Sequence, residues 1–180
     1  PDLRLSSKFI IDDDRFINFA MGNYHQFIST FQDDFTQQIL DSWFAIDEKG
    51  EPSRASQFVL GYEQFMNRGI KVQIEGYYKN ITDMLTYEEK RATTDGRVEN
   101  ESILDLLTPA DGYAYGAELF IQKSIGKLSG WAGYSWSVSR KKMNNKEYFT
   151  NWDRSHVFNI LSNYQINKKW EFNLKYTLQY

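Results

Sequence analysis

The residue types that most often carry out chemistry are scarce in this chain. Its 180 residues include two histidines, His25 and His156, and no cysteine. The lack of cysteine excludes disulfides, thiolate metal sites and cysteine nucleophiles. His156 follows an Asp-Arg-Ser run at 153–155, a setting that would suit a ligand-contacting or proton-linked residue. We favour the simpler interpretation that polar groups of neighbouring strands satisfy its ring.

Three neighbouring carboxylates, Asp12, Asp13 and Asp14, come nearest to a calcium loop. An EF-hand loop that starts at Asp12 needs glycine at its sixth position and glutamate at its twelfth. Ile17 and Asn23 stand there instead, so we predict a plain turn in which aspartate side chains bond nearby backbone amides. The other carboxylates do not pair at a spacing that general acid–base catalysis needs. We therefore predict no enzyme activity and no catalytic, cofactor-binding or metal-binding residues.

Ligand-binding chemistry is concentrated in three long polar segments that carry aromatic side chains. Exposed rings among asparagine, glutamine and aspartate suit a sugar or a bulky aromatic chelate, and they suit packing between neighbouring loops equally well. The sequence therefore leaves the ligand-binding residues unknown. The aromatic candidates are Phe31, Phe35, Trp43, Phe44, Tyr87, Tyr148, Phe149 and Trp152.

Composition excludes some classes of protein and leaves others open. The formal net charge is −3, so the chain has no basic footprint for nucleic acid. No apolar run approaches the ~18 residues of a transmembrane helix, whereas membrane-spanning strands give a weaker signal and are not excluded. The chain begins at Pro1 with neither an initiator methionine nor a signal peptide. We therefore expect a mature or excised piece.

Alternation of apolar and polar residues is the dominant pattern of the chain. From Trp170 to Tyr180 every second residue is aromatic or leucine, and the residues between them are polar or charged. Successive side chains of a strand point to opposite faces, so this stretch predicts one strand with an apolar and a polar face. A short helix is expected within 99–107. Similar patterns predict eight strands, at 3–11, 15–27, 57–65, 70–79, 112–123, 128–139, 152–165 and 169–180.

The connections between these strands alternate in length along the chain. Four are short, as hairpin loops usually are, two are near thirty residues and one is about twelve. In an up-and-down sheet this alternation puts every short turn at one end and every long loop at the other. Outer-membrane barrels have this asymmetry, and strands of about nine to fourteen residues exceed the ~5–6 usual in soluble sheets. We therefore predict an all-β, antiparallel, up-and-down transmembrane barrel segment with short periplasmic turns and long extracellular loops.

Charged residues of both signs recur on the polar faces, and we expect them to form cross-strand charge pairs in the wall of a lumen. A path for substrate along these groups is the alternative. Glycines within the strands are expected to mark bulges, bends or neighbouring aromatic rings. The charged set is Glu75, Glu118, Glu171, Lys71, Lys79, Lys123 and Lys175, and the glycines are Gly61, Gly76, Gly116, Gly130 and Gly133.

Five stretches together resemble the C-terminal half of the barrel of TonB-dependent outer-membrane receptors, particularly those of Bacteroidetes-type bacteria. They are QFVLGYE at 57–63, EGYYK at 75–79, GYAYGAE at 112–118, GKLSGWAGYS at 126–135 and WDRSHVFN at 152–159. The resemblance implies a receptor of the bacterial outer membrane, with about 22 strands around a plugged lumen. It also implies active import of a large ligand such as a siderophore or other metal chelate, or an oligosaccharide.

On this resemblance residues 1–180 form part of a barrel domain and lack the plug. The partners it implies are outer-membrane lipid, the plug and remaining strands of the parent receptor, an inner-membrane energising complex and a surface lipoprotein. No cofactor and no nucleic acid are expected. We further expect an incomplete sheet, because an eight-stranded barrel has an interior just wide enough for its side chains. Trp131, Tyr77 and Phe120 would all point into that interior beside many charged groups.

Two alternatives stay open at this point. A complete eight-stranded outer-membrane barrel, acting as an adhesin or an enzyme, would pair strand 3–11 with strand 169–180. A soluble β-barrel carrier would turn its apolar face inward, whereas a membrane barrel turns that face toward lipid.

Overall fold

The computed structural model describes residues 2–31, 42–45, 51–87, 107–143, 145–150 and 153–180. All regular secondary structure in these residues is β-strand. Within them, no helix is long and apolar enough to cross a membrane. The strands in chain order are β1 (Arg4–Ile10), β2 (Arg15–Gln26), β3 (Ile28–Phe31), β4 (Ser42–Ala45), β5 (Ser53–Met66), β6 (Ile70–Tyr87), β7 (Leu107–Lys123), β8 (Leu128–Met143), β9 (Lys146–Phe149), β10 (His156–Gln165) and β11 (Glu171–Gln179).

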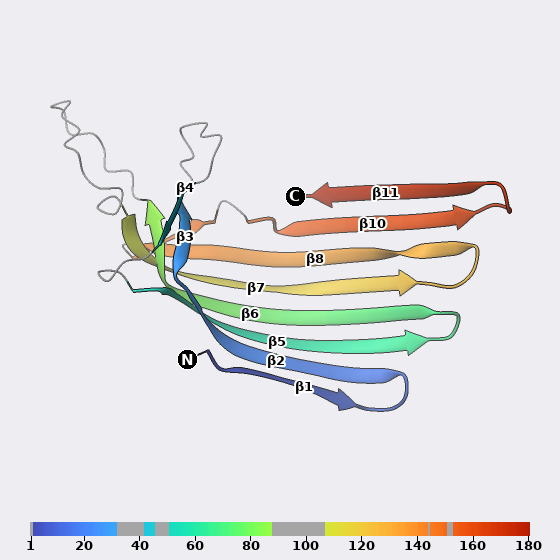
Figure 1. Ribbon diagram of the computed structural model, residues 1–180, viewed down its shortest axis with the longest axis horizontal. Helices are drawn as coiled ribbons and strands as arrows, with labels where there is room; N and C mark the ends of the chain where they lie inside the picture. Colours follow the sequence, from blue (N-terminus) through green and yellow to red (C-terminus); the bar gives the residue numbers. More distant parts are fainter. Residues whose placement is uncertain (1, 32–41, 46–50, 88–106, 144, 151–152) are drawn as a thin grey trace, which may run out of the picture.

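Eight of these strands form an antiparallel meander with the order β1-β2-β5-β6-β7-β8-β10-β11 (Figure 1). β9 pairs with β8 as a ninth strand of this sheet, and β3 and β4 form a separate two-stranded sheet. In the described part of the chain β1 pairs only with β2, and β11 pairs only with β10. The sheet is therefore open, and the predicted antiparallel, up-and-down fold class is confirmed.

The short turns all lie at one end of the sheet and the long connections at the other (Figure 1). The turn at 67–69 shares its end with the turns at 11–14, 124–127 and 166–170. Residues 95–96 lie outside the described residues, but the strand ends that flank them, Tyr87 and Leu107, pair at the opposite end. We call the two ends the turn end and the loop end.

Parts of the long connections are strands that the sequence pattern did not predict. β3 pairs with β4, β9 pairs with β8, and β6 continues to Tyr87. A bulge between Ile81 and Met84, with Asp83 at φ 58°, interrupts the ladder of β6. Such a bulge breaks the period-2 pattern, which is why the pattern ended early. The helix expected within 99–107 is wrong at Leu107, where β7 begins, and the rest of that range lies outside the described residues.

A row of directly paired residues crosses the sheet obliquely. It starts at Phe9, beside the turn end of β1, and reaches Leu178, beside the loop end of β11. The strands are thus staggered along their length, and a barrel wall of tilted strands requires such a stagger. The complete row is Phe9, Ile17, Tyr62, Ile74, Leu119, Tyr134, Phe158 and Leu178.

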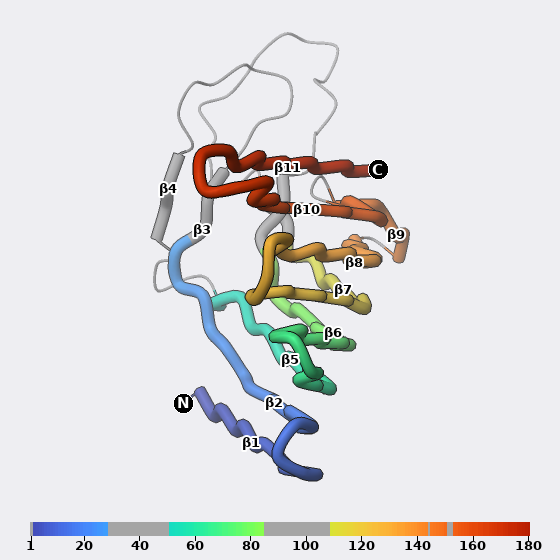
Figure 2. The backbone as a smooth tube through the Cα atoms, turned by 90° about the vertical axis from the view of Figure 1, so that its right-hand side faces the viewer, coloured from blue at the N-terminus to red at the C-terminus, as the bar shows by residue number. Residues whose placement is uncertain are grey.

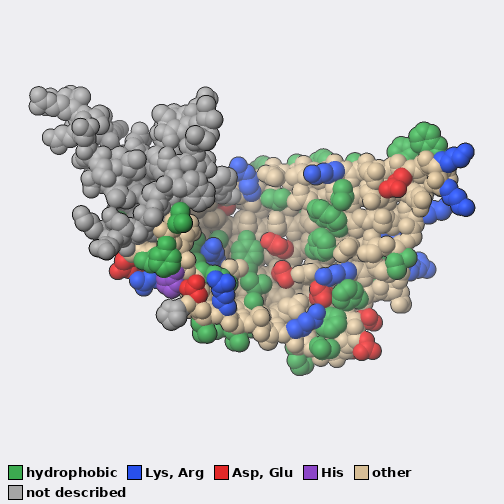
Figure 3. Space-filling view, viewed as in Figure 1, with side chains coloured by type: hydrophobic (Ala, Val, Ile, Leu, Met, Phe, Trp, Pro, Cys, Tyr) green, Lys and Arg blue, Asp and Glu red, His purple; other side chains and the backbone are tan. Residues whose placement is uncertain are grey.

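The sheet is curved, and its two faces differ in chemistry. Figure 2 shows the strands as an arc from β1 to β11. The register keeps the apolar alternates together on one face and the polar alternates on the other. Figure 3 looks onto the concave face, where acidic and basic side chains lie in the middle of the sheet. The apolar alternates therefore cover the convex face.

The convex face is exposed, and the sheet has almost no core. Leu60, Ile74 and Leu174 of this face are 50%, 50% and 57% exposed. Apart from glycines, Ala110 and Glu63 are the only buried residues in the described part of the chain. Soluble monomers rarely expose a continuous apolar surface of this extent. This arrangement is opposite to that of a soluble carrier, in which the apolar face would line the inside.

Candidate functional site: the concave polar face

Alternate residues of neighbouring strands present polar and charged side chains on the concave face. On β6 this set is Lys71, Gln73, Glu75, Tyr77 and Lys79. Every second side chain of a strand points to the same face, so each strand contributes one row of polar groups to the concave face. The cross-strand register then joins the rows into one polar surface.

Glu63 of β5 holds a cluster of charges on this face toward the turn end. Lys71 Nζ lies 2.8 Å from its Oε2, and Lys8 Nζ lies 3.3 Å from its Oε1. The Glu63 side chain is only 11% exposed. Each ammonium group also approaches a ring, with Lys8 4.0 Å from the Phe16 centroid and Lys71 5.7 Å from that of Phe65, a favourable cation–π arrangement. The cluster ties β1, β5 and β6 together.

Two carboxylates face each other near the middle of the concave face. Glu75 of β6 is directly paired with Glu118 of β7. Gln73 Nε2 donates to Glu75 Oε1 at 2.9 Å, and no cation of the described residues forms an ion pair with either carboxylate. Together with Phe120, these three residues line a shallow hollow of about 290 Å³. Like charges directly opposite each other are destabilising. The carboxylate oxygens of the pair can also accept further hydrogen bonds on this face.

The prediction of cross-strand charge pairs in this wall is wrong for most of the residues named for it. Glu75 faces Glu118, and Glu171 faces Gln165. Lys123 belongs to the convex face, because it lies two residues after Ile121 on β7 and alternate residues of a strand share a face. Lys71 does form an ion pair, but with Glu63, which the sequence reasoning missed. The alternation of 57–63 assigns Glu63 to the polar face, so that signal was available.

Aromatic side chains share the concave face with the charges. Phe120 and Trp131 stack with their centroids 5.9 Å apart. The Tyr77 ring covers Gly116, where an added Cβ would lie 2.9 Å from the Tyr77 Oη. As expected, all three aromatic residues lie on the polar face, and Gly116 marks a neighbouring aromatic ring.

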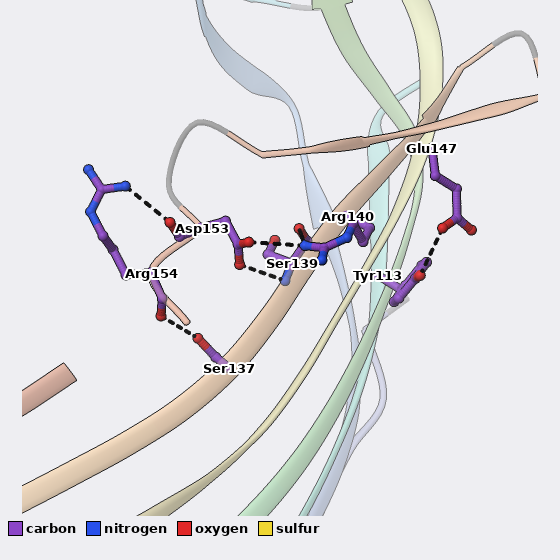
Figure 4. A network of polar contacts seen from close by, with 7 residues as sticks. All are labelled: Tyr113, Ser137, Ser139, Arg140, Glu147, Asp153 and Arg154. Atoms are coloured by element: carbon purple, nitrogen blue, oxygen red, sulfur yellow. Dashed lines mark hydrogen bonds and ion pairs between the residues drawn. The ribbon is translucent and has the colours of Figure 1, made fainter. Parts of the chain in front are cut away.

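Asp153 organises the loop end of β8 (Figure 4). Its Oδ1 accepts the backbone N–H of Ser139 at 3.0 Å, and its Oδ2 accepts from the Arg140 guanidinium at 3.0 Å. The Ser137 hydroxyl donates to the Arg154 carbonyl at 3.1 Å. The strand expected from residue 152 begins instead at His156, because Asp153 bonds β8 through its side chain.

Both histidines have polar partners. His156 Nδ1 lies 2.7 Å from the Tyr134 hydroxyl, and the two rings stack. His25 Nδ1 lies 2.6 Å from Asp2 Oδ1. A hydroxyl of the neighbouring strand thus satisfies His156, as the simpler interpretation predicted.

The aromatic candidates for ligand binding lie apart from one another or outside the described residues. Phe35 and Trp152 are outside the described residues. Tyr148 and Phe149 are exposed on β9, and Arg140 lies 3.8 Å from the Phe149 centroid. For the others the structure gives only the strand: Phe31 on β3, Trp43 and Phe44 on β4, and Tyr87 at the end of β6.

The acidic run at 12–14 forms the predicted plain turn. Asp12 Oδ1 accepts the backbone N–H of Asp14 at 3.1 Å, and Asp12 Oδ2 accepts from Arg15 Nε at 2.7 Å. The hydrogen bond from Arg15 holds the pKa of the Asp12 carboxyl below its usual range. In the described residues, histidine and acidic side chains form no group of three that could hold a metal ion.

Comparisons with known proteins identify the fold. No family model matches the chain, and no curated protein matches it. Its structure is similar to a TonB-dependent receptor in the solved FpvAI–pyocin S2 complex, with a TM-score of 0.61 and 10% sequence identity. The match covers 91% of this chain and 20% of that chain, so the chain spans about a fifth of the receptor's length. At this identity the similarity shows the fold alone: the chain has the strand arrangement of part of a receptor barrel.

Proposed function

We propose that this chain is a segment of the barrel wall of a TonB-dependent outer-membrane receptor that imports a large ligand. The observation that carries the proposal is the chemistry of the curved sheet, which is apolar on its exposed convex face and polar on its concave face. A lipid-facing apolar band around a polar lumen has this arrangement. The turn end then faces the periplasm and the loop end faces the outside.

The open edges of the sheet support a larger barrel. β1 and β11 lie at opposite margins of the arc (Figure 2), and each pairs with one described strand only. Hydrocarbon does not tolerate unpaired backbone groups at a sheet edge. We infer that further strands of a parent receptor pair with both edges and that a plug domain fills the lumen.

The ligand class follows from the resemblance noted in the sequence. We propose a metal chelate such as a siderophore, or an oligosaccharide, taken up with energy from an inner-membrane complex. A Bacteroidetes-type source and a surface lipoprotein partner are parts of the same proposal. The described residues serve binding and passage in it, with no enzymatic step.

The lipid-facing arrangement is tested on the parent protein in vesicles. Single cysteines at positions 172–179 are spin-labelled and exposed to oxygen, which enters lipid, and to a water-soluble nickel complex. We expect oxygen to reach labels at Leu174 and Tyr176, and nickel to reach labels at Lys175 and Thr177. Equal access along β11, or stable folding of the parent protein in plain buffer, would refute the proposal.

Import is tested separately in cells that lack the parent gene. Uptake of labelled siderophores and oligosaccharides is compared with and without the gene, and with and without an uncoupler. We expect one ligand class to require both the gene and the membrane potential. Uptake that is unchanged for all ligands would contradict the import function.

A further inference from the structure

Basic side chains line the turn end along three successive hairpins. We call the set Arg68, Lys123, Lys127, Lys168 and Lys169 the basic rim. The turns at 67–69, 124–127 and 166–170 contain no acidic residue, although the whole chain has a net charge of −3. These three turns are therefore basic, and the first acidic residue beside them is Glu171, directly after the last turn.

The three basic turns are neighbours in space. The Ser124 N–H donates to the Gly69 carbonyl at 2.9 Å, and the Gln165 N–H donates to the Lys127 carbonyl at 2.8 Å. Figure 3 shows Lys and Arg side chains gathered at this end, with acidic side chains near its lower corner and just inward of its upper corner. The turn between β1 and β2, with Asp12, is the acidic one. The basic rim is thus one continuous patch and not a property of every turn.

The charges of the basic rim are available to a partner. Arg68, Lys127, Lys168 and Lys169 are exposed. No carboxylate of the described residues forms an ion pair with any member of the basic rim. The Lys123 ammonium donates to the Ile125 carbonyl at 2.5 Å. Four cationic groups therefore face solvent with no ion-pair partner among the described residues.

Large apolar side chains lie beside these cations. Ile125, Ile166 and Trp170 are 62%, 45% and 63% exposed at the same turns. Trp170 is the first of the apolar alternates that continue along β11 on the convex face. An apolar band bounded by tryptophan and then by lysine is the order of groups at a membrane–water interface.

We propose that the basic rim binds the phosphate groups of anionic phospholipids in the leaflet on the turn side of the membrane. The inference rests on the membrane location proposed above. Lipid is favoured over an acidic protein because the cations continue the apolar surface that faces hydrocarbon. Each lysine or arginine near an anionic surface strengthens attachment about fivefold, and added salt weakens it.

The test uses the whole parent protein, folded in neutral detergent and mixed with equal amounts of phosphatidylglycerol and phosphatidylcholine of the same acyl chains. Native mass spectrometry then gives the ratio of the two bound lipids. We expect a ratio of about ten or more, falling as salt is added. The rim variant R68Q/K127Q/K168Q/K169Q should bring the ratio close to one. The control variant K79Q/K141Q/K146Q/K175Q has the same net charge and should keep the wild-type ratio.

A wild-type ratio near one, a ratio kept by the rim variant or an equal loss in both variants would overturn the proposal. Binding of polyglutamate that depends on the rim, without a lipid preference, would overturn it in favour of an acidic protein partner. If the quadruple variant fails to fold, K168Q/K169Q alone should lower the ratio several-fold. A ratio near one in a protein that still requires detergent refutes the basic rim's role and leaves the receptor barrel standing.

Discussion

Lys71 Nζ lies 2.8 Å from Glu63 Oε2, and this ion pair joins β5 to β6 on the concave face. Glu63→Gln should destabilise the folded barrel by about 1–3 kcal/mol, because it removes a charged acceptor that Lys8 also uses. The measurement is urea unfolding of the parent protein in lipid vesicles. Glu171→Gln, on the same face at the margin of the sheet, is the control and should change stability by less than about 0.5 kcal/mol. Equal losses of stability in the two variants would mean that the ion pair does not stabilise the barrel more than an exposed charge on the same face does.

Glu118→Gln should stabilise the barrel by about 0.2–1 kcal/mol, since it removes a like charge directly opposite Glu75. The same unfolding measurement checks it. In a Glu75→Gln background the gain should disappear, because the two substitutions act on one repulsion. A gain of the same size in both backgrounds would trace the effect to something other than the pair.

Leu174→Arg should cost roughly 2–4 kcal/mol, because Leu174 is 57% exposed on the convex face, where lipid is proposed to lie. Lys175→Gln, the next residue on the opposite face, should cost far less. Unfolding in vesicles measures both. If the charge at 174 is tolerated as well as the amide at 175, the convex face does not meet hydrocarbon.

Gly116→Ala should destabilise the barrel by about 1–3 kcal/mol through overpacking. An added Cβ would lie 2.4 Å from the Trp136 carbonyl oxygen, and the Tyr77 ring covers the same space. Gly76→Ala is the matched control on β6, where the nearest contact would be 3.9 Å, and it should be nearly neutral. The difference between the two variants in vesicle unfolding is the quantity to measure, and no difference would contradict the packing described for Tyr77.

Arg15→Gln should raise the pKa of Asp12, because the Arg15 side chain donates the hydrogen bond that lowers it. A carboxyl whose pKa is lower in the folded state adds stability above its unfolded pKa and loses it as pH falls through the folded value. The stability difference between wild type and variant should therefore shrink on acidification. Carboxyl-carbon NMR of labelled aspartate follows the shift, and an unchanged Asp12 titration would remove Arg15 as its cause.

Much of the sheet could be predicted because its strands carry a long period-2 pattern. The patterns predicted to end at Phe65 and Lys123, for example, each run up to a short turn, and the observed strands end at Met66 and Lys123. The pattern failed at the loop end, where the bulge after Ile81 and the short strand β9 break the alternation. At the loop end the strands pair through backbone hydrogen bonds, which do not require an alternating sequence.

The concave face was harder to predict than the fold. Alternation assigns Glu63 and Glu118 to the polar face, but the partner of each depends on register, and a single residue of shift moves a side chain to the other face. Lys71 consequently pairs diagonally with Glu63, while Glu75 meets another carboxylate. The hydrogen bond from the Ser139 amide to Asp153 had no signal in the sequence. There a side-chain carboxylate, in place of a strand carbonyl, accepts the backbone N–H.

The order of the strands has a consequence for how the sheet forms. Each strand of the path β1-β2-β5-β6-β7-β8-β10-β11 hydrogen-bonds to the strand that precedes or follows it along that path. Successive hairpins can therefore close one at a time without waiting for distant parts of the chain, and local pairing of this kind favours rapid assembly. Every hairpin that closes presents its newest strand as a template for the next. If the convex face meets lipid as proposed, the sheet can form in the bilayer one hairpin at a time along this path.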